Sequence, residues 1–276
     1  MNVKIIIDST IDTTAAVRAQ CAVVPLTVHF GEAEYVDGVT ISHHEFYDKL
    51  ASSSDLPTTS QPTPAAFMQA YQQAVDEGQK AVVLTVSGKL SGTYQSATIA
   101  ATEFPGSVYV VDTRNVAIGS GVLAELAVNL ANHGASAEEI VEAVNAQRDK
   151  VCLVAMLDTL EYLKRGGRIS KTVAFAGELL SIKPIIGIAD GEISILGKAR
   201  GARQGNTMLS SQIEAAGGVD FSKPIMLGYT GNSDALLQKY IAESGIWGEN
   251  PPCACIGSVI GTHAGPGAFA AAFIRK

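Results

Sequence analysis

Short apolar runs alternate with segments of helical spacing along the first 150 residues, and this alternation is the strongest constraint on the fold. Residues 3–7 and 80–86 are apolar runs of strand length, whereas residues 64–75 and 117–133 carry apolar side chains at helical intervals. Strands that alternate with helices predict a mainly parallel sheet covered by helices. We therefore expect an α/β domain over residues 1–150.

Three neighbouring segments fill the gap between the first two strands of this pattern. Residues 22–30 form a strand candidate, and residues 42–51 have helical spacing. Residues 52–64 are rich in Ser, Thr and Pro, so we expect a loop there. Thr63 and Pro64 then open the next helix, because Thr is a good N-cap and Pro suits the first helical position.

The pattern changes after about residue 150. The strand-like runs 184–189 and 192–196 flank Asp190-Gly191, a two-residue hairpin signal. A hairpin requires antiparallel pairing, so we expect a second α/β domain with an antiparallel or mixed sheet over residues 151–276. The other predicted elements include strands at 151–157, 224–229 and 253–260 and helices at 160–163 and 169–181.

Composition limits the possible partners. Hydrophobic residues make up 47% of the 276 residues and charged residues 17%, so the chain can bury a large core and still line an apolar pocket. The net charge is −7, and none of the predicted elements carries a stripe of Lys and Arg. Phosphate backbones require such a basic footprint, so we expect no nucleic-acid partner.

Four cysteines, Cys21, Cys152, Cys253 and Cys255, bear on metal binding. Three of them lie in apolar, strand-like runs, where reduced buried thiols are the expected state. Cys253 and Cys255 are too close in sequence for the usual zinc knuckle. We therefore expect neither a metal site nor a cofactor.

The N-terminal residues have only three apolar side chains between Lys4 and Asp8, too few for the apolar part of a signal peptide. No stretch reaches 18 apolar residues, the length of a membrane-spanning helix. We expect a cytoplasmic protein without stable membrane insertion.

Two polar loops near apolar strands are candidate ligand sites. Residues 58–62 are interpreted first as the approach to the helix that follows. Residues 87–93 join a buried strand to a helix, and Ser91, Thr93 and the backbone N–H groups there could hold an anion. The glycine and lysine spacing of a P-loop is absent, and a flexible cap is the alternative.

Two further loops contain charged or titratable side chains. Arg165-Gly-Gly-Arg168 fits either a helix end with two solvated arginines or a clamp for phosphate or carboxylate. His263 lies between Thr262 and a Gly-Pro-Gly turn, where a role at the edge of a ligand site is plausible.

An enzyme remains an alternative. Ser91 and His263 could form a hydrolase pair, although the Gly-x-Ser-x-Gly elbow is absent and no third residue is evident to orient the histidine. A small-molecule phosphotransferase and a lipid-responsive regulatory module are the other candidates. Turnover without a partner would distinguish the enzymes from a binding protein.

Taken together, these segments resemble the DegV family, whose characterised members bind fatty acids. The resemblance is carried by the order and spacing of IIDST at 6–10, PLTV at 25–28, YVDG at 35–38, TSQPTP at 59–64, LSGTY at 90–94, LKRGGRI at 163–169, KP at 183–184 and HAGPG at 263–267. It implies two α/β domains, with a long-chain fatty acid held in a tunnel mostly within the N-terminal one.

The resemblance also implies a function without turnover of its own. Family members similar to this chain are carriers that present the fatty acid to a separate fatty acid kinase related to dihydroxyacetone kinases. The kinase forms an acyl-phosphate for phospholipid synthesis.

Residue roles follow from the same resemblance. Thr59 and Ser91 are expected to hold the carboxylate, helped by Thr58, Ser60 and the N–H of Gly92. Arg168 and His263 match positions tied to phosphoryl transfer or to docking of the kinase. This chain departs from the family pattern at Gly88, where a Ser is common and glycine lacks the hydroxyl donor, and at Asp12-Thr13.

Overall fold

The computed structural model describes residues 2–169 and 182–276. The first half contains a four-stranded sheet of order β2-β1-β6-β7, in which every pairing is parallel. This confirms the expected parallel sheet. Its strands are β1 (Val3–Asp8), β2 (Cys21–Val24), β6 (Lys80–Thr85) and β7 (Val108–Asp112).

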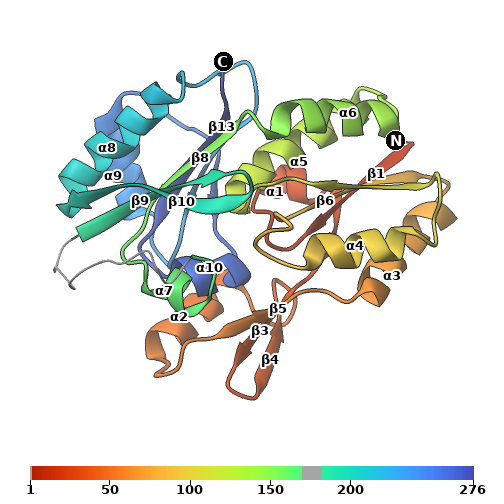
Figure 1. The fold of residues 1–276 in the computed structure, drawn as a ribbon, viewed down its shortest axis with the longest axis horizontal. Helices are drawn as coiled ribbons and strands as arrows, with labels where there is room; N and C mark the ends of the chain where they lie inside the picture. Colours follow the sequence, from red (N-terminus) through yellow and green to blue (C-terminus); the bar gives the residue numbers. More distant parts are fainter. Residues whose placement is uncertain (1, 170–181) are drawn as a thin grey trace.

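Helices cover both faces of this sheet (Figure 1). One face packs on α3 (Pro64–Asp76) and α4 (Thr93–Ala101) through Phe67, Tyr71 and Ala97. The predicted cap of α3 is present, with the Thr63 hydroxyl accepting from the Ala66 N–H. The helices of the other face are α1 (Ala15–Arg18), α5 (Ala117–Asn132) and α6 (Ala137–Arg148).

The predicted strand at 22–30 is two strands in different sheets, because Pro25 interrupts it. β3 (Thr27–Phe30) forms a separate antiparallel sheet of order β4-β3-β5 with β4 (Ala33–Val36) and β5 (Thr58–Ser60). The prediction of a loop over 52–64 is therefore wrong at β5, whose pairing with β3 only the tertiary structure supplies. The helix predicted at 42–51 is α2 (His43–Ser52), which begins with a Ser42–Glu45 capping box.

The second half is built on a six-stranded mixed sheet of order β10-β9-β8-β13-β11-β12. The predicted hairpin is present, and Asp190 and Gly191 have φ values of 49° and 80°, as a tight turn of this type requires. The strands are β8 (Val151–Met156), β9 (Ile182–Ala189), β10 (Glu192–Arg200), β11 (Ile225–Tyr229), β12 (Cys253–Cys255) and β13 (Phe269–Ile274).

One predicted strand of this half is shorter in the structure, and one predicted helix falls almost wholly on residues that the structure does not describe. The strand expected at 253–260 ends at Cys255, and α10 (Ser258–Ala264) follows, because Asp12 and Asp37 accept the first N–H groups of this helix. The helix expected at 169–181 lies outside the described residues. The remaining helices are α7 (Glu161–Arg165), α8 (Gly201–Ala215) and α9 (Ala235–Ser244).

Helix α5 connects the two halves. It packs against β1 of the parallel sheet and against β8, β11 and β13 of the mixed sheet (Figure 1). A helix that is buried on several sides must be apolar nearly all round, and α5 is buried along most of its length. One hydrophobic core therefore runs through both halves.

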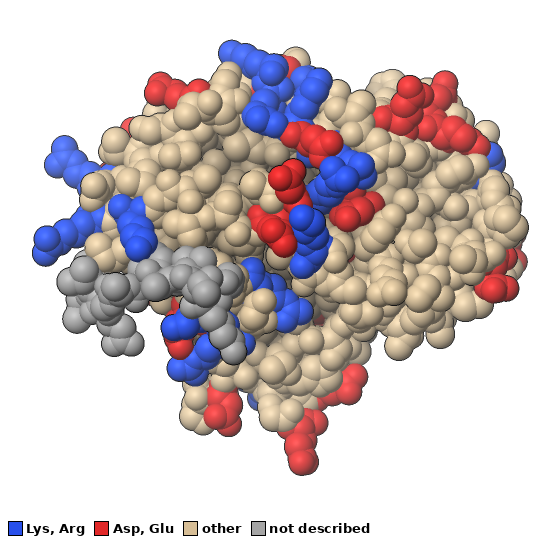
Figure 2. All heavy atoms as spheres, in the orientation of Figure 1, with Lys and Arg blue, Asp and Glu red and all other residues tan. Residues whose placement is uncertain are grey.

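No helix within residues 2–169 and 182–276 has the length and apolarity needed to cross a membrane. On the face shown in Figure 2, acidic and basic side chains are interspersed where the two halves meet, without a broad stripe of one sign.

Candidate functional site

A largely apolar cavity lies between the two halves, next to α5 and α10. The parallel sheet side contributes residues at the carboxyl ends of β1 and β6, such as Thr10 and Val86. Most of the lining comes from residues after 150, chiefly the inner face of the mixed sheet. The lining thus differs from the expectation of a tunnel mostly within residues 1–150.

The smallest side chains of the lining form a row across the mixed sheet. Gly228 of β11 pairs with Ala270 of β13, which in turn pairs with Ala155 of β8. All three line the cavity, and the next residue in the row is Ile186 of β9. Because side chains at paired positions point to the same face, the row leaves a shallow furrow at Ala270 and Ala155. The furrow ends at Gly228, where a Cβ would lie 2.7 Å from the Cδ1 atom of Ile256. The furrow suits a thin, flexible apolar chain.

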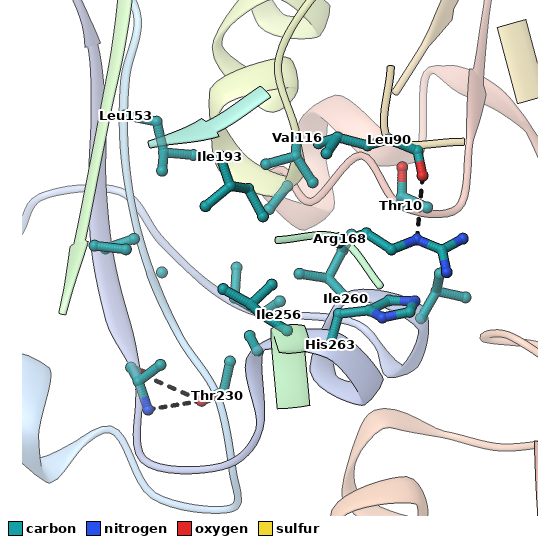
Figure 3. A pocket seen from close by; sticks show the side chains of 18 of the residues that line it. Thr10, Leu90, Val116, Leu153, Arg168, Ile193, Thr230, Ile256, Ile260 and His263 are labelled. Atoms are coloured by element: carbon teal, nitrogen blue, oxygen red, sulfur yellow. Dashed lines mark hydrogen bonds between the residues drawn. The ribbon is translucent and has the colours of Figure 1, made fainter. Parts of the chain in front are cut away.

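Polar side chains are concentrated at one end of the cavity, where Thr10, Thr59, Ser91, Arg168 and His263 all contribute to the lining. Figure 3 shows Thr10, Arg168 and His263 on the same side, with Leu153 and Ile193 away from them. A cavity with a polar end and an apolar remainder matches an amphipathic ligand with one head group.

The loop between β6 and α4 is held in shape by its own backbone. The N–H groups of Leu90 and Ser91 donate to the Ser87 carbonyl, at 3.0 and 3.2 Å. The Ser91 hydroxyl lies 2.9 Å from the Thr93 hydroxyl and accepts from the Thr93 N–H. The Gln61 side chain packs directly over Gly92, since a Cβ there would lie 2.1 Å from the Gln61 amide oxygen and would have to displace it.

Strand alternation separates the three hydroxyl residues of β5. Thr59 faces the cavity, whereas Thr58 and Ser60 are exposed on the opposite face. The Ser60 hydroxyl lies 2.9 Å from Nε2 of His29. The structure therefore does not bring Ser60 to the polar end of the cavity, although the sequence places it next to Thr59.

His263 lies in the last turn of α10, with its Nε2 atom 3.0 Å from the Thr59 hydroxyl. Its Nδ1 atom is buried and has no hydrogen-bond partner among the described residues. Burial, with a smaller contribution from the Arg168 cation, lowers the pKa of His263 to about 4. The imidazole is therefore neutral at physiological pH.

Arg168 links two loops by hydrogen bonds at the polar end of the cavity. Its Nε donates to the Leu90 carbonyl at 3.2 Å, and its Nη1 donates to the Gly166 carbonyl at 2.6 Å (Figure 3 shows the first bond). Arg165 is different, because it is exposed and pairs with Glu161 on the same helix. Of the two arginines in the motif, only Arg168 reaches the cavity.

Sequence reasoning missed Thr10 and the residue that orients it. Asp8 is fully buried and accepts from the hydroxyl and N–H of Thr10 and from the Val86 N–H. Burial raises the pKa of Asp8 to about 6, although these hydrogen bonds act against the shift. The signal that could have found Thr10 is its place directly after a buried strand, where α/β sheets bind ligands.

The geometry does not form the Ser91–His263 hydrolase pair. His263 bonds Thr59, while Ser91 bonds Thr93, and no carboxylate contacts the free imidazole nitrogen within the described residues. Nor do the described residues hold a cluster of His, Cys, Asp and Glu able to bind a metal ion.

Comparison with known proteins supports the family resemblance along nearly the whole chain. The family model described as "Uncharacterised protein, DegV family" matches residues 2–276. A DegV domain-containing protein of Deinococcus radiodurans is 34% identical, with 99% of this chain and 98% of that protein covered.

Two solved structures are also similar. "Fatty Acid Binding of a DegV family Protein from Thermus thermophilus" describes a chain 34% identical, with a TM-score of 0.87 and coverage of 99% of this chain and 100% of that one. The Fak B3 protein of the Streptococcus pneumoniae fatty acid kinase, loaded with linoleic acid, has a TM-score of 0.85 at 23% identity, with both chains fully covered. On the match of the family model and of the relatives, the chain belongs to the DegV family.

Proposed function

We propose that the protein binds a long-chain fatty acid in the cavity between its two halves, with the carboxylate at the polar end. The observation that carries this proposal is the distribution of the lining: Thr59, Ser91, Arg168 and His263 lie at one end, and the remainder is mostly apolar. Thr230 lies away from this end, and its hydroxyl is already hydrogen-bonded to the backbone of Ala268. The acyl chain would lie mainly on the mixed sheet, along the furrow at Ala270 and Ala155.

The acyl chain supplies most of the binding energy in this proposal. Burial of one CH₂ group contributes about 0.8 kcal/mol, so a sixteen-carbon chain offers roughly 11 kcal/mol before ordering costs. A hydrogen bond to a carboxylate adds about 1.5–3 kcal/mol. The apolar lining therefore sets affinity, and the polar end sets orientation.

The hydroxyls of Thr59 and Ser91 are the proposed carboxylate donors, with the Gly92 N–H nearby. A buried N–H without an acceptor is rarer than a buried acceptor without a donor, so the unpartnered Nδ1 of His263 favours the tautomer protonated on Nε2. In that tautomer, His263 donates to the Thr59 oxygen. The Thr59 proton is then free to point at a carboxylate.

The similar structures support this ligand class. The Thermus thermophilus protein is described as a fatty-acid-binding DegV protein, and the Streptococcus pneumoniae protein carries linoleic acid. The second is also named as part of a fatty acid kinase. We extend the proposal to presentation of the bound fatty acid to a separate kinase in the cytoplasm, with Arg168 and His263 supporting transfer of the phosphoryl group.

A carrier needs a carboxylate that is held but still approachable. Arg168 donates its Nε and Nη1 groups to two backbone carbonyls, so it offers no free fork to clamp both carboxylate oxygens, and one oxygen stays open to a phosphoryl donor. The acyl-phosphate carries more charge than the fatty acid, and the Arg168 cation beside it would stabilise that charge.

Native mass spectrometry of the purified protein, followed by organic extraction of the ligand, tests the binding proposal. We expect one fatty acid per chain, either copurified or taken up from added palmitate or oleate. A mass equal to that of the protein alone, unchanged after both additions, would refute the proposal and favour a phosphotransferase.

Replacing Ser91 with alanine removes one proposed carboxylate donor. We expect the variant to fold and to hold the fatty acid more weakly by about 1.5–3 kcal/mol, the range for a hydrogen bond to a charged group. The off-rate of a fluorescent fatty acid measures the change, and Ser60→Ala, on the outer face of β5, is the matched control. Equal off-rates for Ser91→Ala and the wild type would remove Ser91 from the site.

A further inference from the structure

The end of the β9–β10 hairpin extends beyond the mixed sheet toward the first half of the chain (Figure 1). β9 pairs with β8 through residues 185–187, and no later pair joins these two strands among the described residues. The register of the hairpin itself shifts between Ile195 and Gly197. Because strands bend at bulges and glycines, residues 188–195 form an arm that can move relative to the sheet.

The inner side of this arm lines the cavity. Ile188 and Ile193 are paired across the two strands just before the tip, and both contribute to the lining. The neighbouring residues of the tip, Ala189, Asp190 and Glu192, are exposed. The arm is therefore a single layer of chain between the cavity and solvent.

Ser87 holds the tip of the arm on the first half. Ser87 is fully buried, and its hydroxyl donates to the Gly191 carbonyl at 2.7 Å. Gly191 is buried although both of its neighbours in sequence are exposed. A Cβ at this glycine would lie 2.6 Å from the Ser87 Oγ atom and 3.7 Å from the Arg114 Cβ atom. The glycine thus allows the tip to sit directly on Ser87 and Arg114.

The backbone of Ser87 also holds the loop of a proposed carboxylate donor. Its carbonyl accepts from the N–H groups of Leu90 and Ser91, and its hydroxyl accepts from the Lys89 N–H at 3.3 Å. Ser87 itself is not among the described residues that line the cavity. One buried residue therefore joins the loop at the polar end to the arm that covers the apolar part.

We propose that Ser87 is a positioning residue whose hydrogen bond to Gly191 latches the arm over the cavity, and that opening of this latch is the path by which the ligand enters and leaves. The part that concerns the ligand rests on the proposed function, whereas the latch does not. A closed arm encloses an acyl chain, and an open arm exposes Ile188, Ile193 and the cavity. Loops that close over ligands open on the timescale of ligand exchange.

A latch predicts a kinetic effect that differs from the effect of a residue that contacts the ligand. If the ligand passes only through the open form, the rates of uptake and release are both proportional to the fraction of open protein. A weaker latch raises both rates and leaves the dissociation constant nearly unchanged while the closed form predominates. Loss of a carboxylate donor such as Ser91 instead raises the release rate alone.

Ser87→Ala removes the latch. Loss of one net hydrogen bond shifts an equilibrium by roughly two- to tenfold, so we expect uptake and release of a fluorescent fatty acid to accelerate together by that factor in stopped-flow experiments. Ser210→Ala removes a half-buried hydroxyl that lies 3.4 Å from the Tyr240 hydroxyl, between α8 and α9, and is the matched control. Faster release without faster uptake, or unchanged rates in a folded Ser87→Ala protein, would overturn the latch.

A reversible disulfide tests the closed state. The 3.7 Å between the Cβ positions of residues 114 and 191 suits a disulfide. Arg114→Cys and Gly191→Cys are combined with Ser87→Ala, because loss of the hydroxyl makes room for the new side chain. We expect the oxidised protein to exchange fatty acid at least about tenfold more slowly than the same protein reduced with dithiothreitol. Ser87→Ala alone, oxidised and reduced in the same way, controls for the four native cysteines.

Hydrogen exchange of the lipid-free protein separates failure of the latch from failure of the proposed function. The amides of residues 188–195 should exchange roughly two- to tenfold faster in Ser87→Ala than in the wild type, whereas those of β8 and β13 should not change. If this result holds but no fatty acid binds to any variant, the proposed function fails and the latch stands. If fatty acid binds and exchanges equally fast in the oxidised and reduced proteins, the arm is not the path and the inference fails.

Discussion

Ala270→Leu is expected to weaken the binding of long-chain fatty acids to the protein by more than an order of magnitude. Ala270 lies in the furrow, paired with Gly228 on one side and Ala155 on the other, and lines the cavity. Three added carbon atoms displace about three CH₂ groups of the ligand, a loss of about 2.4 kcal/mol or roughly fiftyfold in affinity. Titration with palmitate, followed by native mass spectrometry, measures the loss.

The same variant should bind shorter chains relatively better, because a ligand that ends before Ala270 avoids the added side chain. Ala33→Leu makes the same chemical change at an exposed position of β4 and is the control for solubility and folding. Thermal unfolding of both variants checks that the fold is kept. Unchanged palmitate affinity in a folded Ala270→Leu protein would place the acyl chain elsewhere.

Arg168→Ala is expected to abolish most acyl-phosphate formation in an assay coupled to a fatty acid kinase. Arg168 is the one cation among the cavity-lining residues that the structure describes. Removal of one group that stabilises developing charge commonly lowers the rate by a factor of about 10²–10³. Scintillation or mass detection of the acyl-phosphate product gives the rate.

Two controls separate transfer from binding in this experiment. Palmitate occupancy of Arg168→Ala, measured by native mass spectrometry, should fall much less than the rate. Arg168→Lys keeps the charge but cannot donate to the Leu90 and Gly166 carbonyls in the same fork, so it should recover only part of the rate. An unchanged rate in Arg168→Ala would exclude a role in phosphoryl transfer.

Local patterns predicted many of the elements well. The valine-rich apolar run predicted β6, and Thr63 and Pro64 predicted the start of α3. Asp190-Gly191 predicted the turn between β9 and β10. Each of these signals acts within a few residues. The polar loop at 87–93 was also recognised as a candidate site, because a loop from a strand to a helix N-terminus exposes N–H groups.

Long-range contacts explain what local patterns missed. β5 is a strand only because β3 pairs with it, and α10 begins at Ser258 because two distant carboxylates accept its first N–H groups. Because side chains alternate along β5, Thr59 faces the cavity and Ser60 faces solvent. A run of hydroxyl residues in the sequence does not show which of them faces the cavity.

The sequence by itself determined the α/β fold class and the family, because helices, strands, turns and motifs depend on neighbouring residues. Through the resemblance to that family it also predicted Thr59, Ser91, Arg168 and His263 as site residues. Only the tertiary structure decided that the cavity lies between the halves and that its furrow crosses β13 and β8. The physical reason is that a cavity is bounded by side chains from strands far apart in the chain. The register that aligns Gly228, Ala270 and Ala155 is fixed only when those strands pair.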